Sequence, residues 1–250
     1  ASSGYDLDLA DGLVQAYVES TTSVQDYVQS YEAKTVEDYF NPINHYILGR
    51  LRLKAAEEDR YYFRPAVESF SIALAFGLEE ARTYYYLGNA YDADNTWGLF
   101  YNHHYIESQL EEYEKSILNY ERSIELDPTF LDSYFNLAVI YLVTGNIDRS
   151  LRILETAMTA IPEDPLLIYW YAHFSYIAGN YEDSISNALH ATHIFPQFPH
   201  AYGLLGLAYD KLGEQNMAIA MLRQGFNLGL DNEWEYYRFD YRSTLSRLTD

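Results

Sequence analysis

The feature that most constrains the fold of this chain is a period of about 34 residues in its second half. Three consecutive segments align without gaps, namely 131–164, 165–198 and 199–232. Each contains two stretches with apolar residues at helical spacing, joined by a turn that contains glycine, such as Gly179. A fixed period of this length is typical of stacked helix–turn–helix units. The sequence therefore predicts an all-α chain built from repeated helical hairpins.

Each unit places a small residue where its two helices must approach closely. These residues are Ala138, Ala172 and Gly206. A larger side chain at that point would push the hairpin apart. The inner face of each second helix also repeats small or apolar residues at spacings of four and three. They are Ser150, Leu154 and Ala157; Ser184, Ala188 and Ala191; and Ala218, Leu222 and Gly225.

The period and the small residues make residues 131–232 resemble the tetratricopeptide-repeat family. The resemblance implies a right-handed superhelical solenoid of helix–turn–helix repeats, closed by capping helices at its ends. We expect the repeat array to span residues 41–232. Residues 81–130 form a further unit with an insertion at 95–110, and residues 42–80 form a degenerate unit.

The ends of the array are less regular. In the degenerate unit either Leu48-Gly49 or Leu53-Lys54 can be the close-packing pair, and the first choice implies a longer turn after it. Residues 1–40 are interpreted as an N-terminal extension with one or two capping helices. Residues 233–250 are interpreted as a C-terminal capping helix, because polar residues alternate with aromatic ones that can pack on the last repeat.

Charge and composition exclude several functions. The chain has 37 acidic and 16 basic residues, a formal net charge of -21, which repels phosphate backbones. We therefore expect no nucleic-acid partner. No apolar stretch approaches the roughly 18 residues of a membrane span. The opening Ala1-Ser2-Ser3-Gly4 favours an exported or lipid-tethered protein over a cytoplasmic one, and the compartment stays open.

Catalysis, cofactors and metals are not predicted. The chain has no cysteine, which removes disulfides and thiolate chemistry. It has no glycine-rich phosphate loop and no HExxH zinc pattern. His190 and His193 share a helix face, but no third ligand follows at a metal-binding spacing, and the pair His103-His104 is equally isolated. We expect a non-enzymatic protein without a cofactor.

The family resemblance implies that the first helix of each pair lines a concave groove that binds peptides. The groove residues are then those that point away from the partner helix of the hairpin. They are Arg82, Tyr85, Tyr86, Asn89, Asp132, Phe135, Asn136, Val139, Tyr169, Trp170, His173, Tyr176, His200, Leu204, Leu207 and Asp210. Tyrosine and tryptophan give large contact areas with a polar tip, which suits recognition of a chain or helix.

Two asparagines in this set have a specific expected role. Asn89 and Asn136 match the groove asparagines with which peptide-binding members of the family hydrogen-bond the ligand backbone. Members that capture the carboxylate of a chaperone tail need basic residues in adjacent repeats. Here Tyr85, Leu166 and Trp170 stand at those positions. We therefore expect a partner segment that is neutral, apolar or basic, since an anionic tail would meet an acidic surface.

The insertion at 95–110 gathers aromatic residues that the repeat does not require. Those that we expect at an interface are Trp97, Phe100, Tyr101 and Tyr105. Exposed rings at this density would be a liability on a monomer. The insertion is therefore predicted to pack on the chain itself or to form an interface, including one between copies of the chain in a homo-oligomer.

The function that these features favour is a non-catalytic interaction or scaffolding module, which holds a peptide or helix of a partner protein in its aromatic groove. Two alternatives stay open. An aromatic groove can also stack a sugar or organic solute, as part of an uptake or envelope system. The insertion and the end caps can instead serve self-assembly of a structural protein.

Overall fold

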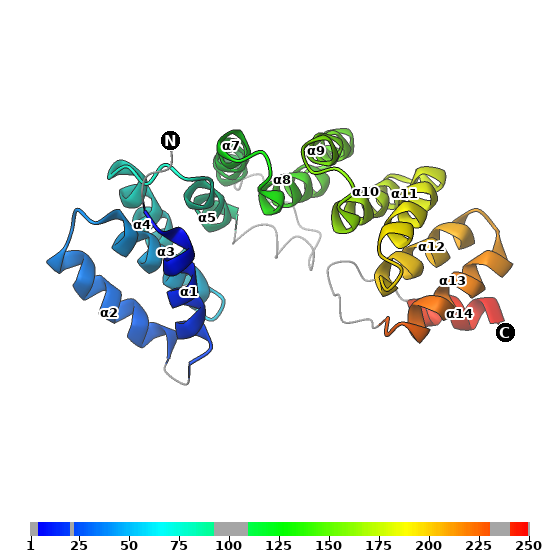
Figure 1. Ribbon diagram of the computed structural model, residues 1–250, viewed down its shortest axis with the longest axis horizontal. Coiled ribbons are helices and arrows are strands. Elements are labelled where there is room, and N and C mark those ends of the chain that lie inside the picture. Colours follow the sequence, from blue (N-terminus) through cyan, green and yellow to red (C-terminus); the bar gives the residue numbers. More distant parts are fainter. Residues whose placement is uncertain (1–4, 21–22, 93–109, 231–240, 250) are drawn as a thin grey trace. The chain divides into compact units, whose positions relative to one another are not determined.

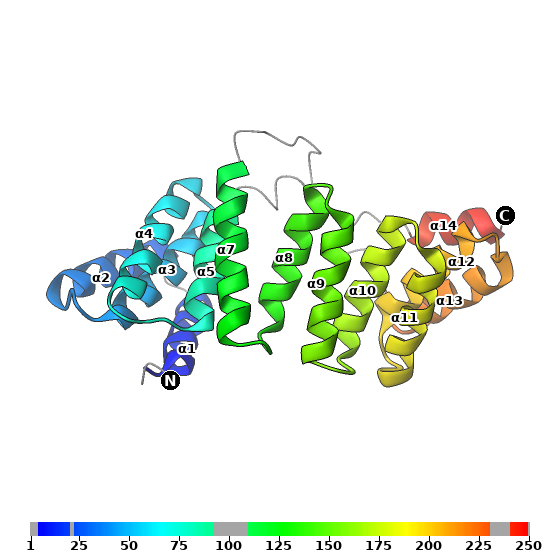
Figure 2. The same cartoon turned by 90° about the horizontal axis from the view of Figure 1, so that it is seen from above.

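The computed structural model describes residues 5–20, 23–92, 110–230 and 241–249. Within these ranges the chain is helical and has no strand (Figures 1 and 2). It divides into two compact units, Ala1–Leu137 and Ala138–Asp250, here called unit 1 and unit 2. The boundary lies between Leu137 and Ala138, inside the helix Leu131–Val143.

Unit 1 contains two leading helices followed by hairpins. Its elements are α1 (Leu7–Val18), α2 (Val24–Glu37), α3 (Pro42–Ala56), the 3-10 turn η1 (Arg60–Tyr62), α4 (Phe63–Ala75), α5 (Ala81–Asp92), α7 (Leu110–Leu126) and the first part of α8 (Leu131–Val143). Helix α3 packs against α4, and α5 packs against α7. Helices α1 and α2 both contact α3 of the first hairpin.

Unit 2 contains the end of α8 and the regular part of the array. Its other helices are α9 (Ile147–Ala160), α10 (Pro165–Ala178), α11 (Tyr181–Ile194), α12 (Pro199–Lys211), α13 (Gln215–Asn227) and α14 (Tyr241–Thr249). The first helices of successive pairs thus begin at Leu131, Pro165 and Pro199, at the predicted period. Helix α10 packs against α11 and α12 against α13, while α14 contacts both α12 and α13.

Local signals explain where these helices begin and end. The carboxylate of Asp164 accepts a hydrogen bond of 2.9 Å from the backbone N–H of Leu167, and Pro165 occupies the first turn of α10. At the other end Gly179 has a φ of 85°, which an L side chain rarely adopts, and it stops α10. The predicted start and stop signals of this helix are confirmed.

Small residues hold the hairpins close, as the sequence predicts. A Cβ atom added at Gly88 would lie 2.6 Å from Cε1 of Tyr120, and one added at Gly206 would lie 2.4 Å from Cγ of Leu222. In the first hairpin the same close approach occurs at Gly49, where a Cβ would lie 2.8 Å from the Phe70 ring. The close-packing pair of that hairpin is therefore Leu48-Gly49, and η1 forms the longer turn after it.

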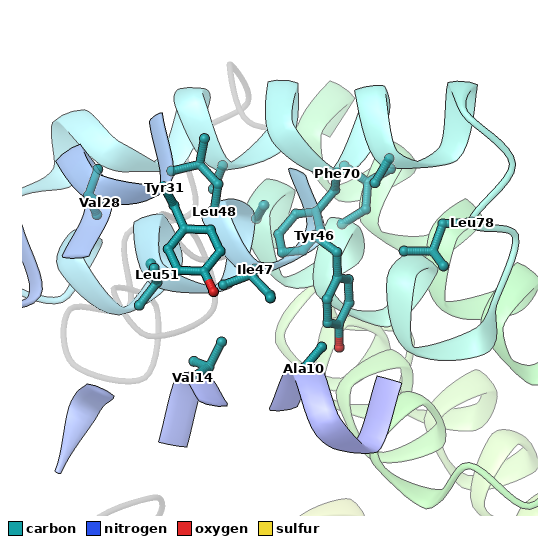
Figure 3. Close-up of a cluster of buried hydrophobic side chains, with 14 of the residues drawn as sticks. Ala10, Val14, Val28, Tyr31, Tyr46, Ile47, Leu48, Leu51, Phe70 and Leu78 are labelled. Atoms are coloured by element: carbon teal, nitrogen blue, oxygen red, sulfur yellow. The ribbon is translucent and has the colours of Figure 1, made fainter. Parts of the chain in front are cut away.

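Each unit has its own apolar core. In unit 1, Figure 3 shows Ala10 and Val14 of α1 facing Tyr46 and Ile47 of α3. The same cluster includes Val28, Tyr31, Leu48, Leu51, Phe70 and Leu78. A cluster in unit 2 brings Leu207, Leu222 and Leu230 together with Tyr241 at the start of α14. Both α1 and α14 therefore bury apolar side chains of the hairpins that they cover.

Two predicted segments fall partly or wholly outside the described residues. The insertion at 95–110 is one of them, apart from Leu110, which begins α7. The predicted C-terminal helix at 233–250 is described from Tyr241, where α14 begins, to Thr249. Among the described helices, none has the length and apolar character that a bilayer crossing requires.

Candidate functional site

The first helices of two consecutive hairpins lie side by side in unit 1. On α5 the predicted groove residues Arg82, Tyr85, Tyr86 and Asn89 fall at helical spacing on one face and are all half-buried. Phe135 and Asn136 on α8 are also half-buried. The amide nitrogen of Asn136 donates a hydrogen bond of 2.8 Å to the carbonyl oxygen of Asn89. The structure thus brings this part of the predicted set together.

A buried tyrosine of α7 organises the two asparagines. The Tyr120 hydroxyl donates to the Asn89 carbonyl oxygen at 2.7 Å and accepts from the Asn136 amide at 3.3 Å. Its side chain is fully buried, and burial raises the pKa of Tyr120 well above the usual value. Tyr120 reaches this position because Gly88 has no side chain in its path. The three residues are called the asparagine site below.

The asparagine site leaves one hydrogen-bonding group available. Asn136 donates from its amide nitrogen to Asn89 and Tyr120 and also bonds to the Tyr85 hydroxyl, and among the described residues no hydrogen bond to its carbonyl oxygen is found. The Asn89 carbonyl oxygen already accepts two hydrogen bonds. Since Asn136 is half-buried and its amide nitrogen is held by hydrogen bonds, its carbonyl oxygen is a preorganised acceptor for a donor from outside.

Two tyrosines flank this site on α5. The Tyr85 ring lies 5.1 Å from the Phe130 ring and 4.9 Å from the Tyr86 ring, measured between centroids. Burial raises the pKa of Tyr85, while the hydrogen bonds from Asn89 and Asn136 oppose the shift. Burial also raises the pKa of Tyr86 to about 12, so both hydroxyls are neutral and able to donate at physiological pH.

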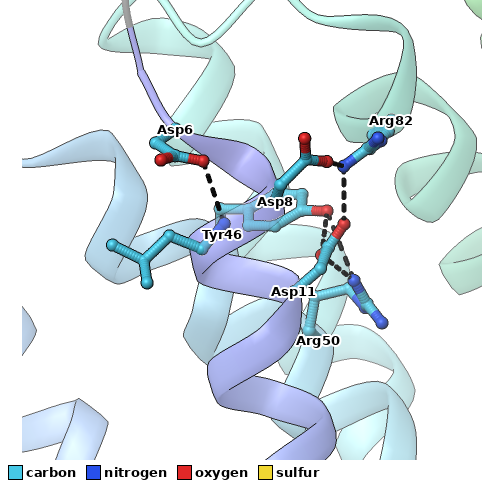
Figure 4. A network of polar contacts seen from close by, with 7 residues as sticks. Asp6, Asp8, Asp11, Tyr46, Arg50 and Arg82 are labelled. Atoms are coloured by element: carbon cyan, nitrogen blue, oxygen red, sulfur yellow. Dashed lines mark hydrogen bonds and ion pairs between the residues drawn. The ribbon is translucent and has the colours of Figure 1, made fainter.

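A second polar cluster lies beside Tyr86. Arg50 on α3 is placed over the Tyr86 ring, 3.8 Å from its centroid. Figure 4 shows the side chains of Arg50 and Arg82 converging on the carboxylate of Asp11 from α1. Arg82 also pairs with Asp8, and the Tyr46 hydroxyl donates to Asp11 at 2.8 Å. Ionised carboxylates between two guanidinium groups form charge-assisted hydrogen bonds.

Sequence reasoning missed Arg50, Tyr46 and the two aspartates. A signal for Arg50 exists, because it follows the small residue Gly49 as Asn89 follows Gly88. It becomes readable only after Leu48-Gly49 is chosen as the close-packing pair. For Asp8 and Asp11 no repeat position exists, since α1 lies outside the array. The hydrogen bonds of Tyr120 to the two asparagines were not predicted either.

The remaining predicted groove residues lie in unit 2, apart from the exposed Asp132 on α8, and most are buried. The buried ones are Val139, Tyr169, Trp170, His173, Leu204 and Leu207, whereas Tyr176, His200 and Asp210 are half-buried. The Tyr169 ring lies 4.8 Å from the Phe198 ring. Burial lowers the pKa of His173 to about 3, which keeps its imidazole neutral. In this unit the predicted aromatic residues mainly fill the interior.

The other candidate residues give no further site. The predicted interface residues Trp97, Phe100, Tyr101 and Tyr105, and the pair His103-His104, lie outside the described residues. His190 and His193 are exposed on α11. Across the described ranges no group of three histidine, aspartate or glutamate side chains is arranged to hold a metal ion.

Comparison with known proteins agrees with this geometry. A family profile described as "TPR repeat" matches residues 105–145, and one described as "Tetratricopeptide repeat" matches residues 131–164 and 199–228. A search of curated proteins gives no match.

Several solved structures have a similar fold. The C-terminal part of a TPR repeat-containing protein from Cytophaga hutchinsonii has a TM-score of 0.68 at 14% identity, over 97% of this chain and 92% of that chain. YrrB, described as a TPR protein with an unusual peptide-binding site, has a TM-score of 0.55 at 16% identity, over 84% of this chain and 96% of that chain. MamA has a TM-score of 0.54 at 18% identity, over 69% and 91%.

At these identities the structural likeness shows the fold alone. The matching profiles cover the first and most of the third of the three segments that the period identified, 131–164 and 199–228, and leave 165–198 unmatched. Repeats of this kind generally form non-catalytic modules for protein–protein interaction. The chain thus contains tetratricopeptide repeats, within residues 105–164 and 199–228.

Proposed function

We propose that unit 1 binds a segment of another protein at the asparagine site and catalyses no reaction. The observation that carries the proposal is the Asn136 carbonyl oxygen, which accepts no hydrogen bond from the described residues, while its amide group is held by Asn89, Tyr120 and Tyr85. A backbone N–H of a bound segment is the matching donor. A hydrogen bond to the main chain binds a segment without selecting for its side chains.

The neighbouring residues support a neutral, apolar or basic segment. Tyr85 and Phe135 are half-buried, so part of each ring stays open to solvent. Asp132 is exposed on the first turn of α8 and adds negative charge. Arg82 is already paired with Asp8 and Asp11. An anionic tail therefore has no unpaired cation to bind at the asparagine site.

The test uses peptides selected by the protein itself. Random peptides displayed on phage are selected on the full chain, and the affinity of each enriched peptide is measured by fluorescence anisotropy. Asn136→Ala removes the proposed acceptor. Because one hydrogen bond contributes about 1 kcal/mol, the affinity is expected to fall about fivefold.

A matched control separates binding from folding. Asn119→Ala on α7 removes another half-buried asparagine of unit 1, whose amide donates to the Lys115 carbonyl one turn away and to no other described residue. This variant is expected to bind like the wild type, and circular dichroism checks that both variants keep their helices. If the selected peptides bind the wild type and Asn136→Ala equally tightly, the asparagine site is not their binding site. A selection without enriched peptides would count against peptide binding as a whole.

A further inference from the structure

Helix α1 covers a basic surface of unit 1 that differs from the asparagine site. This surface consists of Tyr46 and Arg50 on α3 and Arg82 and Tyr86 on α5, and it is called the α1-covered surface below. Helix α1 packs on α3, beside the position where Arg82 projects from α5 (Figure 4). The first helices of two hairpins thus share one occupant, which comes from the chain itself.

The contacts of α1 resemble those of a bound ligand. Asp11 accepts from Tyr46 at 2.8 Å, pairs with Arg50, and pairs with Arg82 at 3.1 Å. Asp8, one turn earlier, pairs with Arg82 as well. The helix has no basic residue, and all of its charged contacts run towards this surface.

An apolar stripe accompanies the two carboxylates. Leu7, Ala10 and Val14 of α1 are buried in the core of unit 1, at spacings of three and four. Leu9 on another side of the helix is 63% exposed. Helix α1 is therefore amphipathic, with a short buried stripe and two aspartates beside it.

The two carboxylates of α1 that pair with arginine differ in exposure to solvent. The Asp8 side chain is 83% exposed and its partner Arg82 is 36% exposed, so solvent and salt screen this pair. The ion pair between Asp11 and Arg50 is better shielded, since the two side chains are 24% and 17% exposed. Three apolar side chains of α1 are buried, and Leu13, Tyr17 and Val18 are partly buried against the same core. Another amphipathic helix with this apolar pattern and a carboxylate in the place of Asp11 can make the same contacts.

The positive charge of the α1-covered surface determines which helices can bind there. The chain as a whole carries a formal net charge of -21, yet two of its 16 basic residues meet at this surface. If α1 leaves, the guanidinium groups of Arg50 and Arg82 lose their carboxylate partners, and Arg50 is already largely shielded from water. A replacement must supply carboxylates, because shielded cations without partners are costly.

We infer that the α1-covered surface is a docking site for an acidic amphipathic helix of a partner protein, which binds by displacing α1. The partner helix carries two carboxylates one turn apart, in the places of Asp8 and Asp11, and an apolar stripe in the place of Leu7, Ala10 and Val14. This inference goes beyond the proposed function, because it concerns another surface and a partner segment of opposite charge character.

The first experiment uses α1 itself as the probe. A synthetic peptide of residues 5–19 with a fluorescent label is titrated with the full chain and its binding followed by anisotropy. In the wild type the chain's own α1 competes with the peptide. In the double variant Asp8→Asn/Asp11→Asn the competitor loses its charged contacts, so we expect the peptide to bind roughly tenfold more tightly. Adding Arg82→Gln to this variant should reverse most of this increase in affinity for the peptide.

Two controls match the change in charge. The double variant Asp26→Asn/Glu37→Gln neutralises two exposed acidic residues of α2 that make no ion pair with the described residues, and it should bind the peptide like the wild type. A peptide in which both aspartates are asparagine should bind every variant weakly. Equal affinity of the wild type, the α1 variant and the α2 variant would overturn the inference.

A second measurement needs no variant. Hydrogen exchange is followed by mass spectrometry on the wild-type chain labelled with ¹⁵N, so that its own α1 fragments are distinguished from the peptide. Saturating peptide should speed up exchange within α1, residues 7–18, and leave α13 unchanged. Bound peptide with unchanged protection of α1 would show that α1 is not displaced, and would overturn the inference.

The outcomes also separate this inference from the proposed function. Failure of the residue 5–19 peptide to bind, while phage-selected peptides remain sensitive to Asn136→Ala, rejects the docking site alone. Binding of the residue 5–19 peptide that depends on Arg82 but not on Asn136 supports the docking site, whatever the selected peptides do.

Discussion

Replacing Gly88 by alanine tests the packing that creates the asparagine site. A Cβ at residue 88 would lie 2.6 Å from Cε1 and 2.8 Å from Cδ1 of Tyr120. Carbon atoms in contact normally keep about 3.5–4.0 Å apart. The Tyr120 ring is fully buried and its hydroxyl is bonded to Asn89 and Asn136, so it cannot move aside freely. The added methyl group must therefore displace α7 or the ring.

The magnitude follows from two opposing effects. Overpacking a buried site costs about 1–3 kcal/mol, and the shielded, hydrogen-bonded ring places Gly88→Ala in the upper half of that range. The higher helix propensity of alanine over glycine stabilises the folded state by about 1 kcal/mol. We expect the free energy of unfolding of unit 1 to fall by about 1–2 kcal/mol. Peptide binding at the asparagine site should weaken as well, because Tyr120 holds both asparagines.

Gly12 provides a matched control in the same unit. It lies within α1, and a Cβ there would meet no other atom within 4 Å. Gly12→Ala therefore keeps only the propensity gain and should stabilise the helix by about 1 kcal/mol. The same chemical change is thus expected to act with opposite sign at the two glycines.

The assay is urea unfolding followed by far-ultraviolet circular dichroism. Hydrogen exchange of α5 and α7 fragments assigns the change to unit 1. With a slope of about 1–3 kcal/mol per molar urea, Gly88→Ala should lower the midpoint by roughly 0.5–1 M. A Gly88→Ala variant as stable as the wild type, or stabilised like Gly12→Ala, would refute the close approach of Tyr120 to α5.

Three further predictions concern unit 2. Burial lowers the pKa of His173 to about 3, so between pH 6.5 and 3 the imidazole is protonated in the unfolded chain and neutral in the folded one. As the pH decreases through this window, the free energy of unfolding should decrease by roughly 1.4 kcal/mol per pH unit. His173→Gln should remove this contribution to the pH dependence measured by urea unfolding. Tyr241→Ala empties a buried site under α14 and should cost about 3 kcal/mol, measured as a lower thermal midpoint. Gly179→Ala forces an L side chain to a φ of 85° and should cost about 1–2 kcal/mol in the same assay, and a neutral result would contradict the left-handed end of α10.

The period, the small residues and the helix stops could be predicted because they follow from local geometry. Gly88 and Gly206 show this, since each lies where a Cβ would collide with one ring or branched side chain of the partner helix. Asp164 and Gly179 act within one turn of their own helix, so the sequence alone shows their roles. The first hairpin was ambiguous only because Leu53-Lys54 could also be its close-packing pair.

The candidate site could be predicted only in part, because burial depends on contacts distant in sequence. Trp170 and His173 have the helical phase of groove residues, yet unit 2 buries them. Asn89 and Asn136 were expected as separate contacts to a ligand backbone, whereas Tyr120 joins them into one network. The pairing of Asp11 with Arg50 and Arg82 joins α1 to the array, and no period relates these residues.

The most direct test of the central claim is a hydrogen-exchange footprint of the full chain with a phage-selected peptide bound. The account predicts slower exchange in α5, residues 81–92, and in the α8 residues 131–137, with no change in α13. It also predicts that the Asn136→Ala variant shows a weaker footprint at the same peptide concentration. Protection confined to unit 2, or a footprint that Asn136→Ala leaves unchanged, would contradict the claim that unit 1 binds its partner at the asparagine site.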